Sequence, residues 1–209
     1  MTPIRTIALI GLTLCFVFGV VRARADDPTG ELIALLSEIQ SLQGRFEQRQ
    51  YDDTGALVQA SSGRFRLLRP GYFAWEIESP DRQLVIADPQ FVWHHDLDLE
   101  TVTRRPVTGS VDTSPLQVLG GNESVLREQF TVTRPDSGRF LLVAGDGDAG
   151  FRQLILRVEG GNILGMEILN TLNQRVTIDF LDVDRATVLT PADFRFEPPP
   201  GADLFYYEQ

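Results

Sequence analysis

The sequence contains no lysine, one cysteine and two histidines, and each of these shortages removes a class of chemistry. All 19 basic residues are arginine, which excludes Schiff-base and Ser-Lys catalysis. His94 and His95 are adjacent on a predicted strand, so their rings should point to opposite faces. Such a pair is poorly suited to a shared metal site, and no G-x-S-x-G motif supplies a nucleophile. We therefore expect no metal, no cofactor and no catalytic residue.

Residues 1–25 are typical of a cleaved secretory signal. A charged start is followed by an uncharged run of 15 residues at 7–21, which is short for a transmembrane span. Ala23-Arg24-Ala25 fits a cleavage site. Cys15 lies inside this segment and is preceded by leucine, where a lipid-anchored cysteine expects a small residue. The prediction is a signal followed by one domain, 26–209.

Removal of this signal changes the charge of the chain. Removing 25 of 209 residues leaves 184 residues and no cysteine. Three arginines and no acids leave, so 16 basic residues face 29 acids and the net charge moves from −10 to −13. A surface this acidic is repelled by phosphate backbones and by anionic lipid headgroups. Nucleic acid is therefore excluded as a partner.

Three helices are predicted. Residues 29–42 form the first, where Thr29 can cap the N-terminus and one face is apolar. The apolar positions are Leu32, Leu35, Leu36, Ile39 and Leu42. Two short helices are predicted at 113–120 and 122–128, where cap residues precede apolar runs. Neither is long enough to be stable alone, so both should lie on an apolar surface.

After Gly44 the apolar pattern changes to period two, which indicates an antiparallel sheet. Turn residues separate the runs at 52–55, 146–148 and 160–162. About eleven strands are expected, at 44–51, 63–70, 72–78, 83–88, 91–96, 98–104, 129–134, 139–144, 151–158, 163–169 and 174–182. The predicted architecture is one curved antiparallel sheet whose concave face is covered by the three helices.

Two neighbouring predicted strands carry aromatic side chains on one face only. In the first, alternation places Phe65 and Leu67 on the same face as Arg69. In the second, the corresponding face holds Phe73, Trp75 and Ile77. Two interpretations of Arg69 remain open. Its guanidinium either extends into water at the rim of the sheet, or it donates to carbonyl groups at a helix end above an apolar concavity.

Acidic pairs leave one enzymatic possibility open. Asp182 and Asp184 lie two residues apart on a predicted strand and can share a face. A solvated strand edge explains such a pair, and a glycosidase-like pair of carboxylates is the alternative. Asp146-Gly147-Asp148 resembles the start of a calcium loop but lacks the downstream glutamate, so a turn is expected.

The order of several short motifs resembles the LolA family of periplasmic outer-membrane lipoprotein carriers. The motifs are Leu68-Arg69-Pro70 with Phe73-Ala74-Trp75, the strand 84–88, Val92-Trp93, Ser114-Pro115-Leu116 and the ending FRFEPPPG at 194–201. The resemblance covers essentially the whole mature chain. The chain departs from the family pattern in lacking lysine and in its aromatic tail, Leu204-Phe205-Tyr206-Tyr207.

The resemblance implies an unclosed antiparallel β-barrel of about eleven strands, with a helical lid over an apolar cavity that receives acyl chains. It also implies that Arg69 hydrogen-bonds lid backbone and holds the empty lid shut. The residues expected to line the cavity are Phe65, Leu67, Phe73, Trp75, Ile77, Leu84, Ile86, Trp93, Val176 and Ile178. Those expected in the lid are Leu116, Val118, Leu119, Val125 and Leu126.

The resemblance further implies a monomeric, non-enzymatic carrier in the periplasm of a Gram-negative bacterium. Its partners would be acylated lipoproteins, an inner-membrane ATP-driven transporter that releases them, and an outer-membrane receptor. Two alternatives remain open at this point. One is a LolA-like paralogue or sensor that binds another lipid or amphiphile, and the other is an enzyme that acts on a lipid or glycan.

Overall fold

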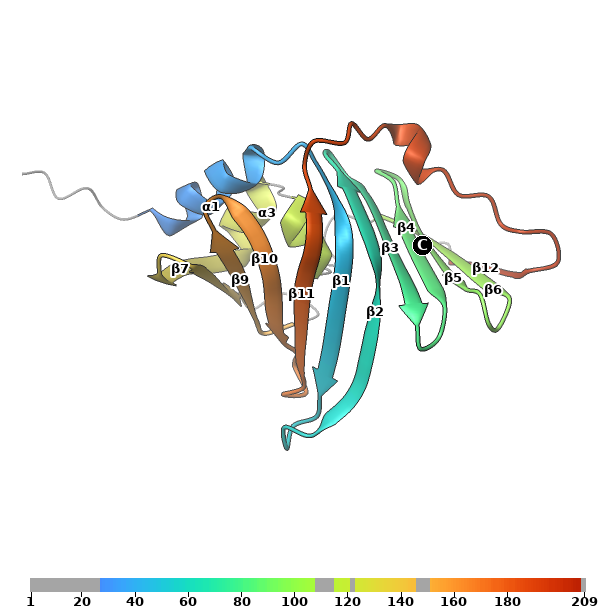
Figure 1. Ribbon diagram of the computed structural model, residues 1–209, viewed down its shortest axis with the longest axis horizontal. Coiled ribbons are helices and arrows are strands. Elements are labelled where there is room, and N and C mark those ends of the chain that lie inside the picture. The colour runs from blue at the N-terminus through green and yellow to red at the C-terminus, as the bar shows by residue number, and fades with distance from the viewer. Residues whose placement is uncertain (1–26, 108–114, 121–122, 146–150, 208–209) are drawn as a thin grey trace, which may run out of the picture.

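The computed structural model describes residues 27–107, 115–120, 123–145 and 151–207 (Figure 1). The side chains of residues 115–117 are not among those described. The predicted signal, with Cys15, and the predicted turn at 146–148 lie outside the described residues.

The described chain forms three α-helices, twelve strands and one 3-10 helix. In chain order, these are α1 (Pro28–Ser37), β1 (Ser41–Tyr51), β2 (Leu57–Leu68), β3 (Tyr72–Ser79), β4 (Gln83–Ala87), β5 (Phe91–Asp96), β6 (Thr101–Pro106), α2 (Pro115–Gly120), α3 (Glu123–Gln129), β7 (Phe130–Asp136), β8 (Arg139–Ala144), β9 (Gln153–Glu159), β10 (Asn162–Leu169), β11 (Arg175–Asp184), η1 (Pro191–Phe194) and β12 (Asp203–Tyr206).

All twelve strands belong to one curved sheet, in the order β12-β6-β5-β4-β3-β2-β1-β11-β10-β9-β8-β7. The described edges, β12 and β7, lie at opposite ends of the sheet, so the barrel is open (Figure 1). The predicted fold class is confirmed. The predicted strand number is one short, because β12 is a four-residue strand after a proline-rich segment and pairs in parallel with β6. Sequence alternation over four residues is too short to indicate a strand.

The pairing of β1 with β11 contains a bulge. Gln43 pairs with Asp184 and Arg45 with Leu181, so two residues of β11 oppose the single residue Gly44. A Cβ atom at Gly44 would lie 2.8 Å from the Leu181 carbonyl oxygen, a contact that only glycine avoids. Such a bulge increases local twist and bends the strand that carries the extra residue.

The first helix begins and ends earlier than predicted. Asp27, rather than Thr29, caps it, since the Asp27 Oδ1 accepts from the Gly30 N–H at 2.9 Å. Pro28 occupies the first turn, where its missing N–H costs nothing. Leu42, predicted to be helical, lies in β1. It is still buried in the main core, because the chain turns directly from the helix into an inward-facing strand position.

One face of the sheet, here the inner face, carries the three helices and the main core (Figure 1). Leu32 and Leu36 of α1 are fully buried there, and Phe140 and Leu156 contribute from β8 and β9. The helices are too short to be stable in isolation, so burial against the sheet is what stabilises them. The expectation that the concave face lies under helices is confirmed.

The opposite, outer face has its own smaller apolar cluster. Phe194 of η1 is 2% exposed and packs on Tyr72 with ring centroids 5.6 Å apart. Ala74 and Ile86, from β3 and β4, complete the buried part of this cluster with Leu189. The segment after β11 therefore covers the part of the outer face formed by β3, β4 and β5 (Figure 1).

We expect Phe194→Ala to lower the free energy of unfolding by about 3 kcal/mol, since truncating a buried phenylalanine costs about 3–5 kcal/mol. Phe205→Ala is the control, because Phe205 is 52% exposed in the neighbouring tail, and its change should stay below about 1 kcal/mol. Urea unfolding followed by circular dichroism measures both. Equal losses for the two variants would show that the outer cluster does not stabilise the fold.

Candidate functional site

The inner face of β2 and β3 carries the aromatic surface that alternation predicted. Phe65 pairs with Trp75 and Leu67 with Phe73 across the two strands, so all four side chains lie on one face. Phe65 is 2% exposed and Trp75 5%, whereas Phe73 is half-buried. The site is therefore built on two paired strands rather than on loops.

Trp75 is the centre of an aromatic group that also draws on β1 and β11. Its ring stacks on Phe46 with centroids 3.6 Å apart and planes at 21°. Phe73 lies 6.0 Å from the same ring, and Phe65 contacts Phe180 at 4.8 Å. Aromatic pairs of this kind contribute about 0.5–1.5 kcal/mol each beyond the area they bury. Sequence reasoning missed Phe46 and Phe180, although extending the alternation from Leu42 and from Ile178 would have found both.

Seven of the ten residues predicted to line a cavity lie together on the inner face. They belong to the main core or pack against it: Phe65, Leu67, Phe73, Trp75, Ile77, Val176 and Ile178. They share this core with buried residues of the helices, so the inner face is packed as a core while the helices cover it.

The other three, Leu84, Ile86 and Trp93, do not lie where the cavity was predicted. Ile86 pairs with Ala74 and with Trp93, which puts these side chains on the outer face. Trp93 there contacts Phe196 with ring centroids 5.4 Å apart. The inner position of β4 is instead Val85, which packs against the main core. Both faces of this strand are apolar, so its sequence does not reveal which face is which.

Helices α2 and α3 lie over the aromatic surface and are called the lid below. Val118, Leu119 and Leu126 are at most 2% exposed in the main core, and Val125 packs against it. These four predicted lid residues therefore meet the inner face. The fifth, Leu116, lies in α2, but its side chain is outside those described.

Arg69 connects the sheet to the lid. Its Nη2 donates to the carbonyl oxygen of Leu119 at 2.5 Å, and its backbone N–H donates to the Gln40 carbonyl at 2.9 Å. Leu119 is the next-to-last residue of α2, where helix carbonyls have no partner within the helix. Of the two interpretations of Arg69, the structure therefore supports the one in which it donates to a helix end. We call this bond the latch.

The latch holds an incompletely satisfied charge. Burial lowers the pKa of Arg69 to about 10, because removing a guanidinium from water disfavours its charged form. The side chain is still charged at neutral pH. Since the folded pKa lies below the unfolded one, this cost to stability is fully present below about pH 10 and fades as pH rises above it. The Arg69 Nε is also buried without a hydrogen-bond partner among the described residues.

The first helix is attached to the sheet by a separate polar contact. Arg134 of β7 forms an ion pair with Glu31 of α1 and donates to the Ser137 carbonyl at 3.0 Å. Its guanidinium also lies over the Phe140 ring, 5.1 Å from the centroid. α1 is therefore anchored at the β7 edge independently of the latch.

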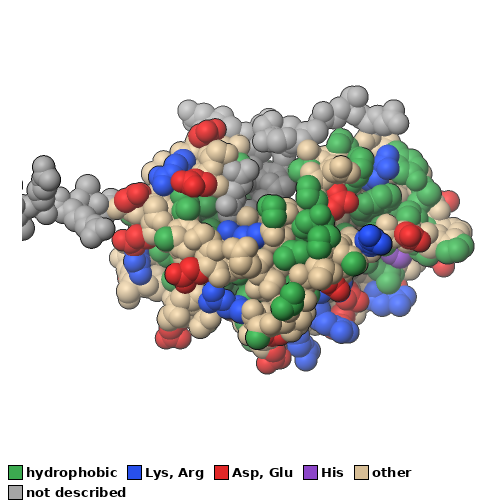
Figure 2. Space-filling model, turned by 90° about the horizontal axis from the view of Figure 1, so that it is seen from above, with side chains coloured by type: hydrophobic (Ala, Val, Ile, Leu, Met, Phe, Trp, Pro, Cys, Tyr) green, Lys and Arg blue, Asp and Glu red, His purple; other side chains and the backbone are tan. Residues whose placement is uncertain are grey.

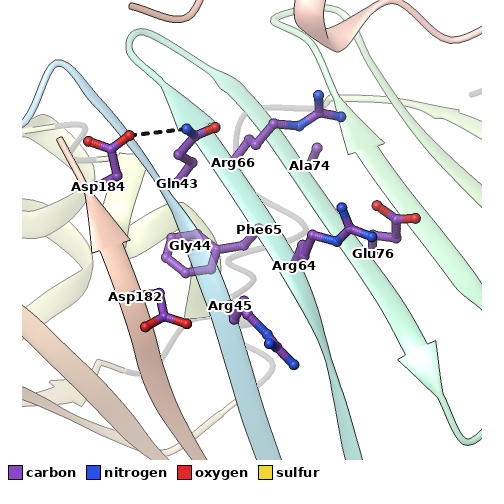
Figure 3. Close-up of a pocket in the computed structure, with 10 residues that line it drawn as sticks. All are labelled: Gln43, Gly44, Arg45, Arg64, Phe65, Arg66, Ala74, Glu76, Asp182 and Asp184. Carbon is purple, nitrogen blue, oxygen red and sulfur yellow. Dashed lines mark hydrogen bonds between the residues drawn. The ribbon is translucent and has the colours of Figure 1, made fainter. Parts of the chain in front are cut away.

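A polar hollow of about 430 Å³ lies on the other side of these strands. Figure 3 shows Arg64, Arg66 and Glu76 beside it, with Asp182 and Asp184 across β1. The Thr187 hydroxyl, the Ala186 N–H and Gln43 hold the pKa of Asp184 down at about 2. A carboxyl group with so low a pKa has lost its proton near neutral pH, so it is unsuited to act as a general acid there. The structure therefore gives no support to a glycosidase-like pair at these two positions.

Figure 2 shows the molecule from above the view of Figure 1, where acidic and arginine side chains mix with hydrophobic ones over the described part of the chain. Several charged side chains of the molecule are paired, as in Arg64 with Glu78 and Arg82 with Asp98. Exposed pairs of this kind contribute little to stability. The net negative charge therefore affects which partners the surface repels, and it contributes little to the stability of the fold.

The two histidines lie on opposite faces, as predicted. His94 pairs with the inward-facing Val85, and its Nε2 lies 3.3 Å from the Gln83 Oε1. His95 faces outward against the Phe196 ring, with centroids 5.7 Å apart. Burial lowers the pKa of His95, which fits a neutral ring packed on an aromatic one. Within the described ranges, no three His, Cys, Asp or Glu side chains are grouped to hold a metal ion.

Comparison with known sequences gives consistent results. The model of the family described as "Outer membrane lipoprotein carrier protein LolA" matches residues 37–197. An outer-membrane lipoprotein carrier protein of Coxiella burnetii is 32% identical over 202 residues, which is 95% of each chain. The protein of the same name from Pseudomonas paraeruginosa is 33% identical over 209 residues, covering 98% of this chain and 99% of the other.

Among solved structures, an uncharacterised conserved protein from Thermus thermophilus has a similar fold. The TM-score is 0.54 at 12% identity, over 87% of this chain and 100% of that one. At this identity the likeness concerns the fold alone. None of the helices in the described part of the chain combines the length and apolarity that crossing a bilayer requires.

We expect Arg69→Leu to loosen the lid without unfolding the protein. The amides of α2 should exchange about tenfold faster, since a hydrogen bond from a charged donor contributes about 1.5–3 kcal/mol and its loss also relieves a desolvated charge. Hydrogen–deuterium exchange of a peptide covering 115–120 measures this. Arg45→Leu is the control, because Arg45 is exposed on the outer face. Identical exchange in both variants would contradict the latch.

Proposed function

The chain belongs to the LolA family of outer membrane lipoprotein carrier proteins, and from this membership we propose that it carries lipoproteins through the periplasm. It binds their acyl chains against the inner face of its sheet. It receives them from an ATP-driven transporter of the inner membrane and delivers them to a receptor at the outer membrane. The relatives are named as carriers rather than enzymes, which agrees with a function in binding alone.

The observation that carries this proposal is the latch above an aromatic surface. Burying one CH₂ group gains roughly 0.8 kcal/mol, so a ~16-carbon acyl chain gains on the order of 12 kcal/mol. A protein that took up the chain with all of that energy would not release it. The inner face is already covered by Val118, Leu119 and Leu126, so a ligand must displace these contacts before it is bound.

Opening the lid exchanges one set of contacts for another. An acyl chain takes the place of α2 and α3 on Trp75 and its neighbours, and the bond between Arg69 and Leu119 breaks. The closed state is therefore a competitor of the ligand, and its stability sets how readily the chain leaves. α1 remains anchored to β7 by Glu31 and Arg134 throughout.

Phe73 provides the test of the proposed function, because it is the half-buried aromatic residue beside Trp75. In cells depleted of the native protein, we expect lipoproteins to remain in the inner membrane. Plasmid-borne wild type and Phe73→Leu should restore their delivery, whereas Phe73→Glu should fail because a carboxylate opposes the entry of an acyl chain. Fractionation of the two membranes measures delivery.

Two results would overturn this proposal. Normally sorted lipoproteins in depleted cells would reject the carrier role and favour another amphiphile as ligand. Full rescue by Phe73→Glu, at wild-type protein level, would show that this face does not admit the acyl chain.

Arg69→Leu should separate loading from release. The variant lacks the bond that stabilises the empty, closed state, so it should accept lipoprotein normally and transfer it poorly to the receptor. In a reconstituted assay, we expect the transferred fraction to fall about tenfold while the loaded fraction is unchanged. Arg45→Leu, on the outer face, should transfer like wild type. Unchanged transfer by Arg69→Leu would exclude a role of the latch in release.

A further inference from the structure

The inner face of β1 and β2 changes from apolar to polar along the strands. Phe46 and Phe65 are followed, towards the β1–β2 turn, by four polar residues that alternation and register place on the same face. These four, called the polar end below, are Gln48, Gln50, Gln59 and Ser61. Gln48 pairs with Ser61, and Gln50 pairs with Gln59. In Figure 1 the ends of β1 and β2 near this turn project beyond the helices.

The polar end adjoins the apolar surface on its β11 side. Gln48 pairs with Ile178, which is 3% exposed in the main core, and Gln50 pairs with Val176. Consecutive inward positions on a strand are about 6.6 Å apart, twice the rise per residue, so Gln48 lies one such step from Phe46. An elongated apolar ligand lying on Phe46 and Ile178 would therefore reach the two glutamines with its end group.

Ser61 makes the polar end unusual. It is 7% exposed, and it is the one polar or charged residue among the buried residues that the structure describes. Its Oγ has no hydrogen-bond partner among the described residues. A buried hydroxyl without a partner is unfavourable unless something supplies one, and a ligand atom is one such partner.

We propose that the polar end binds the carbonyl groups at the heads of the acyl chains. This inference rests on the proposed function and adds to it the orientation of the acyl chain on the inner face. An acyl chain carries a carbonyl by definition, and that oxygen loses its water when the chain is buried. The Ser61 hydroxyl and the side-chain amides of Gln48 and Gln50 are donors suited to it. The chain then lies with its methylenes on the aromatic surface and its ester or amide head at the β1–β2 end.

The inference is tested with two synthetic lipopeptides that differ only in carbonyl groups. One is a cysteine peptide carrying two palmitoyl esters on a thioglycerol, and the other is its dihexadecyl ether counterpart. Displacement of a naphthalene sulfonate dye from the full chain measures the affinity of each. One net hydrogen bond changes binding about 2- to 12-fold, so we expect the wild type to prefer the diester about tenfold.

Paired variants assign that preference to the polar end. The triple variant Gln48→Leu, Gln50→Leu and Ser61→Ala should bind both probes equally, since the three proposed donors are gone while the apolar surface is intact. Ser62→Ala is the matched control, because Ser62 is the next residue of β2 and faces the other side of the sheet. It should keep the wild-type preference.

The outcomes separate this inference from the proposed function. Equal binding of diester and diether by the wild type would overturn the inference and leave acyl-chain carriage intact. A preference that survives in the triple variant would also overturn it, by placing the donors elsewhere. Failure of both probes to bind the wild type would reject the proposed function together with the inference.

Discussion

An open sheet with an apolar inner face has to keep that face covered, and the rest of this structure is arranged around that constraint. A closed barrel covers its interior by its own curvature, but here β12 and β7 end the sheet without meeting. Short helices supply the missing cover, and the contacts that hold them include buried apolar side chains, the Arg134–Glu31 pair on α1 and the bond from Arg69 to α2. Because the cover is a separate part, the proposed function can displace it without breaking the sheet, which would not be so for a core formed by strands alone.

The two faces of the sheet use covers of different kinds. On the outer face, Phe194 and Phe196 pack on Tyr72 and Trp93, and the segment that carries them continues into β12, which pairs with β6. Displacing it would break strand pairing as well as aromatic contacts. On the inner face, α2 contributes Val118, Leu119 and the latch. The difference makes the outer cover part of the fold and the inner one a candidate moving part.

Much of the fold is readable from the sequence, because most strands have one wet face. Alternation places Phe65 on the same face as Arg69, Phe73 with Trp75, and the two histidines on opposite faces, all as the structure has them. It fails in β4, where Leu84, Val85 and Ile86 are all apolar and only the register with β3 decides which one faces inward.

Two features depend on more than alternation. The predicted first helix is too long because Leu42 fits both the helical spacing of the apolar residues before it and the period-two spacing of the strand after it. The role of Arg69 depends on the carbonyl of Leu119, fifty residues away in sequence, and alternation carries no information about such a contact.

The chemistry of the latch explains why an arginine suits this position in a chain without lysine. Burial lowers the pKa of Arg69 to about 10, which leaves it charged at neutral pH. A lysine begins near pKa 10.4, so a similar loss of hydration would bring it to ~8, close to losing its charge when the lid closes. The guanidinium keeps its charge, and with it a donor stronger than a neutral one. In the proposed function, that charge also favours reopening of the latch. With Nε unpaired in the closed state, opening returns the guanidinium to water and recovers part of what the broken bond loses.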